Sequence, residues 1–138
     1  MGLTVLDAGV LIAVLDGNDL HHDAARHALS AALDGNDQLA VPASALAETL
    51  VGAARRGDDA IAVVNEFVRR LPATVVPVDE PMAVAAARLR ARHGGRLKLP
   101  DALVVATAQV LDAERLLTTD RGWPARRSLG LRAQVVRV

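Results

Sequence analysis

The feature that most constrains the fold is the alternation of short apolar, strand-like segments with longer helix-like segments. Strands are expected at residues 3–6, 39–41, 74–78, 116–118 and 134–138. Helical patterns occupy most of the intervals, at residues 8–15, about 20–33, 44–56, 58–70, 79–93 and 101–111. Strands that are joined through helices pair in parallel, and a parallel sheet is covered by helices on both faces. The sequence therefore predicts an α/β fold, a three-layer α/β/α sandwich around a mostly parallel sheet of four or five strands.

The length of the chain, 138 residues, is near the commonest size for one domain, and we expect a single domain over residues 1–138. Phe67 and Trp123 are its only aromatic residues, so the core must be built from Ala, Val and Leu, and Trp123 is expected to pack against the sheet. The absence of cysteine excludes disulfides, thiolate zinc sites and thiol catalysis. No apolar stretch approaches the ~20 residues of a membrane span, and Asp7 interrupts the apolar N-terminus, so we expect neither export nor membrane insertion.

Four acids lie where the pattern changes from strand to helix or in the turn after a strand: Asp7, Glu48, Asp101 and Asp120. Each has an ordinary structural explanation. Asp7 can cap a helix, and Asp120 can stabilise a turn. Glu48 and Asp101 can stabilise the first turns of helices through the helix dipole. Ser44 is the expected N-cap of the helix that carries Glu48. Taken singly, none of these residues indicates a function.

The joint arrangement of the four acids is more informative. In a parallel sheet the carboxyl ends of the strands and the amino ends of the following helices lie along one edge, where ligands bind. Carboxylates brought together there repel one another unless a cation neutralises them. Mg²⁺ prefers such oxygen ligands together with substrate phosphate, and Mn²⁺ can substitute for it. The pattern therefore predicts a metal site that hydrolyses phosphodiester bonds through a metal-activated water.

The net charge of zero hides an asymmetry along the chain. Residues 1–80 carry five basic and twelve acidic side chains, whereas residues 81–138 carry eleven basic and four acidic ones. A basic second half suggests a polyanionic partner, although solvated helix faces explain any single arginine equally well. Arg88, Arg92, Arg96 and Lys98 precede Asp101 and are candidates to guide RNA phosphates. The adjacent His21 and His22 lack further ligands in the pattern and are expected to lie at the surface near a helix start.

Four segments together resemble the PIN-domain ribonucleases, and more closely the VapC-type toxins of bacterial toxin–antitoxin pairs. The segments are Val5-Leu6-Asp7-Ala8 with Leu11-Ile12-Ala13, then Ser44-Ala45-Leu46-Ala47-Glu48, then Leu99 to Ala108 around Asp101, and Leu117-Thr118-Thr119-Asp120. The Asp101 segment is the most specific of them. Their order and spacing extend the resemblance over nearly the whole chain.

The resemblance implies a role for each matching residue. Asp7 and Asp101 match the principal metal ligands of the family, Glu48 its third acid, and Asp120 a fourth that often acts through water. Thr118 matches a hydroxyl that supports the site. One departure is Gly9, since many relatives carry Ser, Asn or Thr two residues after the first Asp. A side-chain hydrogen bond from that position is therefore missing here.

The resemblance also implies a cytoplasmic Mg²⁺-dependent endoribonuclease that cleaves structured RNA, often transfer or ribosomal RNA. It implies a homodimer that a small VapB-type antitoxin neutralises, in a heterotetramer or larger complex, with an antitoxin segment over the cleft. The alternative is a catalytically silent PIN-fold module that binds RNA or protein. A receiver domain is disfavoured because paired acids after the first strand and a functional lysine are not evident. A haloacid-dehalogenase-type phosphatase is disfavoured because Gly9 stands where it needs a second Asp.

Overall fold

The computed structural model describes residues 2–138, and its centre is a sheet of five parallel strands in the order β3-β2-β1-β4-β5. The strands are β1 (Leu3–Leu6), β2 (Gln38–Pro42), β3 (Ala73–Val76), β4 (Arg115–Thr118) and β5 (Gln134–Arg137). The helices are α1 (Ala8–Leu15), α2 (His22–Asp34), α3 (Ala43–Arg56), α4 (Asp58–Arg70), α5 (Glu80–His93), the short 3₁₀ turn η1 (Gly94–Arg96) and α6 (Leu99–Val110). The predicted α/β sandwich is confirmed, and its sheet is parallel throughout.

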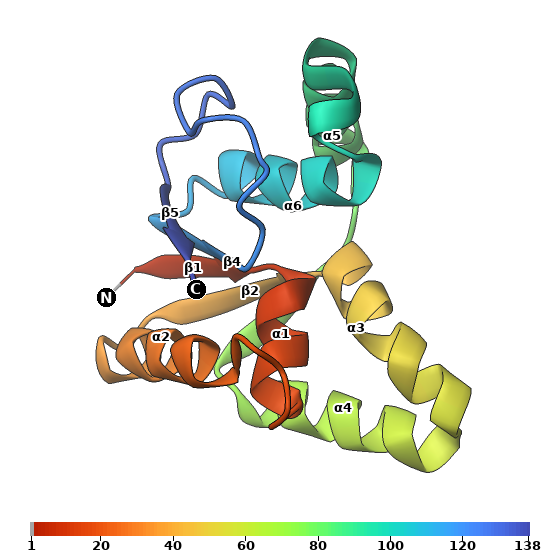
Figure 1. Ribbon diagram of the computed structural model, residues 1–138. Helices are drawn as coiled ribbons and strands as arrows, with labels where there is room; N and C mark the ends of the chain where they lie inside the picture. Colours follow the sequence, from red (N-terminus) through yellow and green to blue (C-terminus); the bar gives the residue numbers. More distant parts are fainter. Residues whose placement is uncertain (1) are drawn as a thin grey trace.

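Alternate residues of each strand point to opposite faces of the sheet, and this builds two separate cores. Val5 and Leu116 face α6, together with Trp123 from the segment between β4 and β5. Leu6 and Leu117, their neighbours in sequence, face α1 and α2. Figure 1 shows α5 and α6 on one side of the sheet and α1, α2 and α4 on the other. None of the helices within residues 2–138 is long and apolar enough to cross a membrane.

Helices α3 and α6 begin at other residues than predicted. Helix α3 begins at Ala43 rather than after a Ser44 cap, and its N-cap position is held by Pro42, which makes no side-chain bond to the helix. The Ser44 prediction was wrong because β2 continues through Pro42 and leads directly into the helix. Helix α6 begins two residues earlier than predicted, at Leu99, with Pro100 in its first turn.

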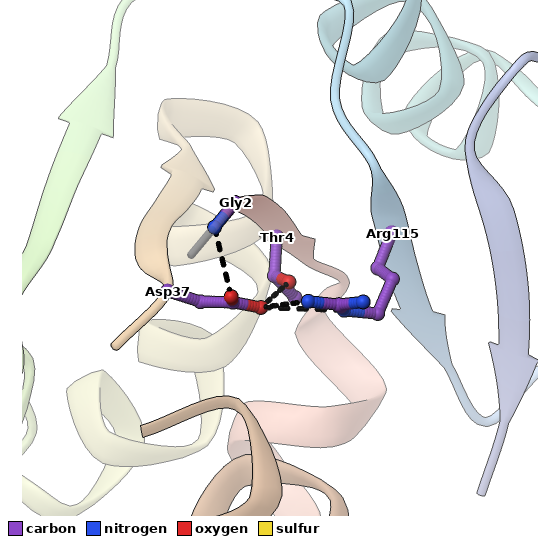
Figure 2. Close-up of polar contacts among 4 residues, drawn as sticks. All are labelled: Gly2, Thr4, Asp37 and Arg115. Atoms are coloured by element: carbon purple, nitrogen blue, oxygen red, sulfur yellow. Dashed lines mark hydrogen bonds and ion pairs between the residues drawn. The ribbon is translucent and has the colours of Figure 1, made fainter. Parts of the chain in front are cut away.

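A buried carboxylate that we had not singled out from the sequence ties together the amino edge of the sheet (Figure 2). Asp37 precedes β2, and its side chain has no exposed surface. It accepts hydrogen bonds from Thr4 Oγ1 and Arg115 Nη2, both at 2.7 Å, and from the backbone N–H of Gly2 at 3.0 Å. Burial alone would raise the pKa of Asp37, but the bonds from Arg115 and Thr4 outweigh it and hold the pKa below its usual value. The segment before β2 is thus fastened to β1 and β4 at the edge opposite the four acids.

Candidate active site

Asp7 follows β1 directly and is held from two directions. Its Oδ1 accepts a hydrogen bond from the backbone N–H of Ala8 at 2.8 Å, which makes Asp7 the N-cap of α1. Its Oδ2 accepts a hydrogen bond from Thr118 Oγ1, at the end of β4, at 2.7 Å. Asp7 is 7% exposed. The capping explanation is therefore correct, and it leaves both oxygens with a further lone pair for another ligand.

Thr118 connects Asp7 to Asp120. The Thr118 hydroxyl donates to Asp7 and accepts a hydrogen bond from the backbone N–H of Asp120 at 3.0 Å. Asp120 Oδ1 in turn accepts the backbone N–H of Gly122 at 2.7 Å, so this acid also has the turn role that its position suggested. One buried hydroxyl thereby sets the position of two of the four acids, because it bonds to the side chain of one and the backbone of the other.

Glu48 and Asp101 come to the same edge on helices. Glu48 lies in the second turn of α3, and Asp101 in the first turn of α6. Figure 1 shows α1 and α3 leaving the sheet at the same edge, which is the carboxyl edge of β1 and β2. Each of the four acids is within electrostatic reach of at least two of the others, so the structure brings all four together.

Burial and mutual repulsion raise the pKa of three of these acids. Burial is the largest cause for Asp7, Glu48 and Asp101 alike. The charge of Asp101 raises the pKa of Glu48 further, and the charges of Asp7 and Asp120 help to raise the pKa of Asp101 to about 6. The hydrogen bonds from Thr118 and Ala8 oppose this trend at Asp7. The ionised cluster is thus electrostatically unfavourable by itself and would be stabilised by a cation.

The indole N–H of Trp123 is a polar group of the site, in addition to the packing role that was expected from the sequence. The residue is 5% exposed, and its indole N–H is directed toward Asp101 and lowers the pKa of that acid. Within residues 2–138 the Nε1 atom is buried and makes no complete hydrogen bond. No periodicity marks this nitrogen in the sequence. Only its position three residues after Asp120 could have drawn attention to it.

The possible metal ligands at this edge are hard carboxylate oxygens, and such ligands suit Mg²⁺ or Mn²⁺. Among residues 2–138, however, no three Asp, Glu or His side chains lie close enough together to hold a cation between them as they stand. The chemistry of the donors fits the metal, and their charges repel one another. Binding of a cation would therefore require the carboxylate side chains to move closer together, and the metal site stays a prediction.

The four basic residues named from the sequence do not gather in one place. Lys98 lies near Asp101 and lowers the pKa of that acid. Arg88 and Arg92, on α5, instead line a shallow hollow with Gln109 from the far end of α6. Arg96 lies in η1, two residues before Lys98. Of this set, Lys98 is the residue that the structure places beside the acids.

A hollow of ≈ 340 Å³ adjoins the acids between α1, α3 and α4. It is lined by Glu48 and Arg56, and by apolar side chains that include Ile12 and Val64. Ile12 is 38% exposed, so part of its apolar surface is accessible at this hollow. A larger, mainly apolar hollow of ≈ 570 Å³ lies between α2 and strands β4 and β5, and none of the four acids lines it.

Known proteins are similar to this chain in sequence pattern and in fold. The sequence model of the PIN domain matches residues 4–128. The fold is similar to that of VapBC2 from Rickettsia felis, solved bound to a DNA fragment from its promoter (TM-score 0.74, 15% identity, 96% of this chain and 98% of that chain). It is also similar to VapBC-1 from nontypeable Haemophilus influenzae (0.70, 15%, 98% and 97%) and to VapC20 from Mycobacterium tuberculosis, described as a sarcin–ricin loop cleaving toxin (0.67, 17%, 82% and 86%). No curated protein gives a significant sequence match.

Proposed function

This chain belongs to the PIN-domain family, and on that premise we propose that it is a metal-dependent endoribonuclease, the toxin of a VapBC-type toxin–antitoxin pair. The observation that carries the proposal is the group of four coupled acids at the carboxyl edge of the sheet. Three of them have raised pKa values, for which burial and mutual repulsion are causes. Asp7 and Asp120 also serve as a helix cap and in a turn, but bringing all four acids together is electrostatically unfavourable for the fold, whereas a cation-binding protein needs such a group.

Asp7 and Asp101 would hold the metal directly, with Glu48 as a third ligand and Asp120 acting through water. Mg²⁺, or Mn²⁺ in its place, would lower the pKa of a bound water and stabilise the charge that develops on the phosphate. The protein's own contribution is to orient these ligands. Thr118 fixes the carboxylate of Asp7 in one orientation. The Lys98 charge and the Trp123 N–H favour the ionised form of Asp101, which is the form that binds a cation.

We propose structured RNA, of the transfer or ribosomal class, as the substrate. The basic second half of the chain and the placement of Lys98 beside Asp101 support a polyanionic substrate. The description of the structurally similar VapC20 as a toxin that cleaves the sarcin–ricin loop supports RNA in particular. Arg96, and more remotely Arg88 and Arg92, would add sequence-independent contacts to phosphates.

The partner is proposed to be a VapB-type antitoxin, since several structurally similar proteins were solved as VapBC complexes. The hollow between α1, α3 and α4 suits an antitoxin segment with apolar side chains. The hollow is lined by the apolar residues Ile12 and Val64, and the acid Glu48 would attract a basic residue of that segment. We further propose that the toxin is a cytoplasmic homodimer and joins the antitoxin in a heterotetramer or larger complex.

The decisive experiment compares two Asp→Asn variants on structured RNA with and without Mg²⁺. Asp101→Asn should abolish cleavage, because it removes a ligand charge while keeping the shape of the side chain. Asp59→Asn is the matched control. Asp59 also lies in the first turn of a helix but is exposed and remote from the acids, so this variant should cleave normally. Equal cleavage by wild type and Asp101→Asn would overturn the metal-nuclease proposal. RNA binding by the wild type without cleavage at any metal concentration would favour the catalytically silent module instead.

A further inference from the structure

The first turn of α1 is in unusually close contact with the turn that follows β4. Gly9 lies two residues after Asp7, and Thr119 lies between Thr118 and Asp120. A methyl group added at Gly9 would overlap the hydroxyl oxygen of Thr119 and would lie 3.3 Å from the Cβ of Thr119. The Thr119 hydroxyl therefore occupies the space that a side chain at position 9 would need.

The contact is close to the acids on both sides. Gly9 belongs to the helix that Asp7 caps, and Thr119 is flanked by the residue that bonds to Asp7 and by Asp120. The hydrogen bonds that organise this turn use the Thr118 hydroxyl and the side chain of Asp120, but not the Thr119 hydroxyl. That hydroxyl stands against the first turn of α1 and remains available to a further partner.

We propose that Thr119 is a positioning residue for the acid cluster. Its hydroxyl, which comes from the turn after β4, stands against position 9 in the first turn of α1, the helix that Asp7 caps. Position 9 is glycine because that hydroxyl takes the room of its side chain. The inference rests on the proposed metal site for the role of the hydroxyl, but the steric exclusion between Gly9 and Thr119 is independent of it.

The steric part makes a specific prediction about Gly9→Ala. A threonine can rotate its hydroxyl away from a new methyl group, so the protein should still fold with only a modest loss of stability. This rotation would move the Thr119 hydroxyl away from the first turn of α1. Gly9→Ala should therefore show the same loss of metal response as Thr119→Val, which keeps the shape of threonine without the hydroxyl.

The experiment measures the rise in melting temperature with added Mn²⁺ or Mg²⁺, in the absence of RNA, for a set of six variants. Thr119→Val should raise the half-saturating metal concentration by about tenfold, which is the scale seen when a group that orients metal ligands is lost. Thr119→Ser should remain within about twofold of the wild type, since it keeps the hydroxyl. Thr119→Ala alone should behave like Thr119→Val. The double variant Gly9→Ala, Thr119→Ala should be more stable than Gly9→Ala but should still lack the metal response. The double variant Gly9→Ser, Thr119→Ala should recover both the stability and the metal response, since it moves the hydroxyl to position 9.

Failure of this inference differs from failure of the proposed function. If wild type responds to metal and Thr119→Val responds equally, the hydroxyl has no positioning role. The same conclusion follows if the two double variants respond alike, because then only packing is restored. A lack of metal response in the wild type itself would overturn the proposed function, and with it the role of Thr119. If Gly9→Ala destabilises the protein equally in the presence and absence of the Thr119→Ala substitution, the two positions do not exclude each other.

Discussion

Thr118 Oγ1 donates a 2.7 Å hydrogen bond to Asp7 Oδ2, and this bond joins the ends of two neighbouring parallel strands. Both residues are buried. The same hydroxyl accepts the backbone N–H of Asp120, so the link extends to a second acid. One side chain at the end of β4 therefore helps to position an acid at the end of each strand, and burial and the charges of these two acids raise the pKa of Asp101.

Replacing Thr118 with valine should weaken the site more than the fold. The hydroxyl lowers the pKa of Asp7, so its loss should raise that pKa further and reduce the ionised fraction that binds metal. We expect cleavage to fall by about 10–100-fold, and the free energy of unfolding by about 1–2 kcal/mol for the buried acceptor left unpaired. RNA cleavage and urea unfolding measure the two effects. Thr118→Ser should restore both, and a serine variant as impaired as valine would show that the methyl group, not the hydroxyl, is what matters.

The raised pKa of Asp101 predicts an unusual pH dependence for the metal-free protein. The folded state holds a proton on Asp101 up to a pKa of about 6, above the ordinary value of 3.8, so the folded state binds more protons between these values. Stability should therefore fall as pH rises from about 4 through 6. Asp101→Asn removes this penalty and should be more stable than the wild type at pH 7.5, by on the order of 1 kcal/mol after allowance for solvent screening.

Urea unfolding in EDTA at pH 4 and pH 7.5 tests this dependence. The free energies of unfolding of wild type and Asp101→Asn should differ little at pH 4, where Asp101 is protonated. At pH 7.5 the Asp101→Asn variant should be the more stable protein. In the wild type, stabilisation by Mn²⁺ should increase as pH rises through 6, because the cation competes with the proton. A wild type that is the more stable protein at pH 7.5 without metal would contradict the raised pKa.

Trp123→Phe should separate the two roles of the tryptophan. Phenylalanine keeps an aromatic ring in the core but has no N–H, and that N–H lowers the pKa of Asp101. The pKa of Asp101 should rise above about 6, so the pH at which Mn²⁺ begins to stabilise the protein should increase, and metal affinity at pH 6 should fall a few-fold. Thermal unfolding over a pH series measures this midpoint. An unchanged midpoint would mean that Trp123 serves only as packing.

The Asp37 cluster at the opposite edge should govern stability without affecting catalysis. Asp37→Asn removes the charge that pairs with Arg115 and leaves buried donors poorly matched, so we expect a loss of about 2 kcal/mol at pH 7. Glu66→Gln is the control, since Glu66 pairs with Arg70 at the surface and should cost less than about 0.5 kcal/mol. The pKa of Asp37 is lower in the folded state than in the unfolded state. The stabilisation that Asp37 provides is therefore complete above its pKa in the unfolded state, and it is lost as the pH falls through its pKa in the folded state. The difference between wild type and Asp37→Asn should accordingly shrink in acid, and a difference that grows in acid would refute the lowered pKa.

The sequence by itself determined the architecture and the identity of the acids. The periodicity of the apolar residues is local, and it sufficed to predict strands, helices and a parallel sheet. Asp7, Glu48, Asp101 and Asp120 were identifiable because each comes near a strand or helix end, and parallel strands carry such ends to one edge.

Only the tertiary structure decided how side chains from distant segments meet. The Thr119 hydroxyl fills the space at Gly9, 110 positions away in a chain of 138 residues, and the Trp123 N–H faces Asp101 across a helix–turn contact. Asp37 was not singled out from the sequence and is a buried anchor, while Ser44 was expected to cap a helix and does not. Capping preferences and turn preferences are local, whereas burial and pairing depend on which segments the sheet order places side by side. The strand order β3-β2-β1-β4-β5 sets these pairings, and it is a property of the whole packed chain.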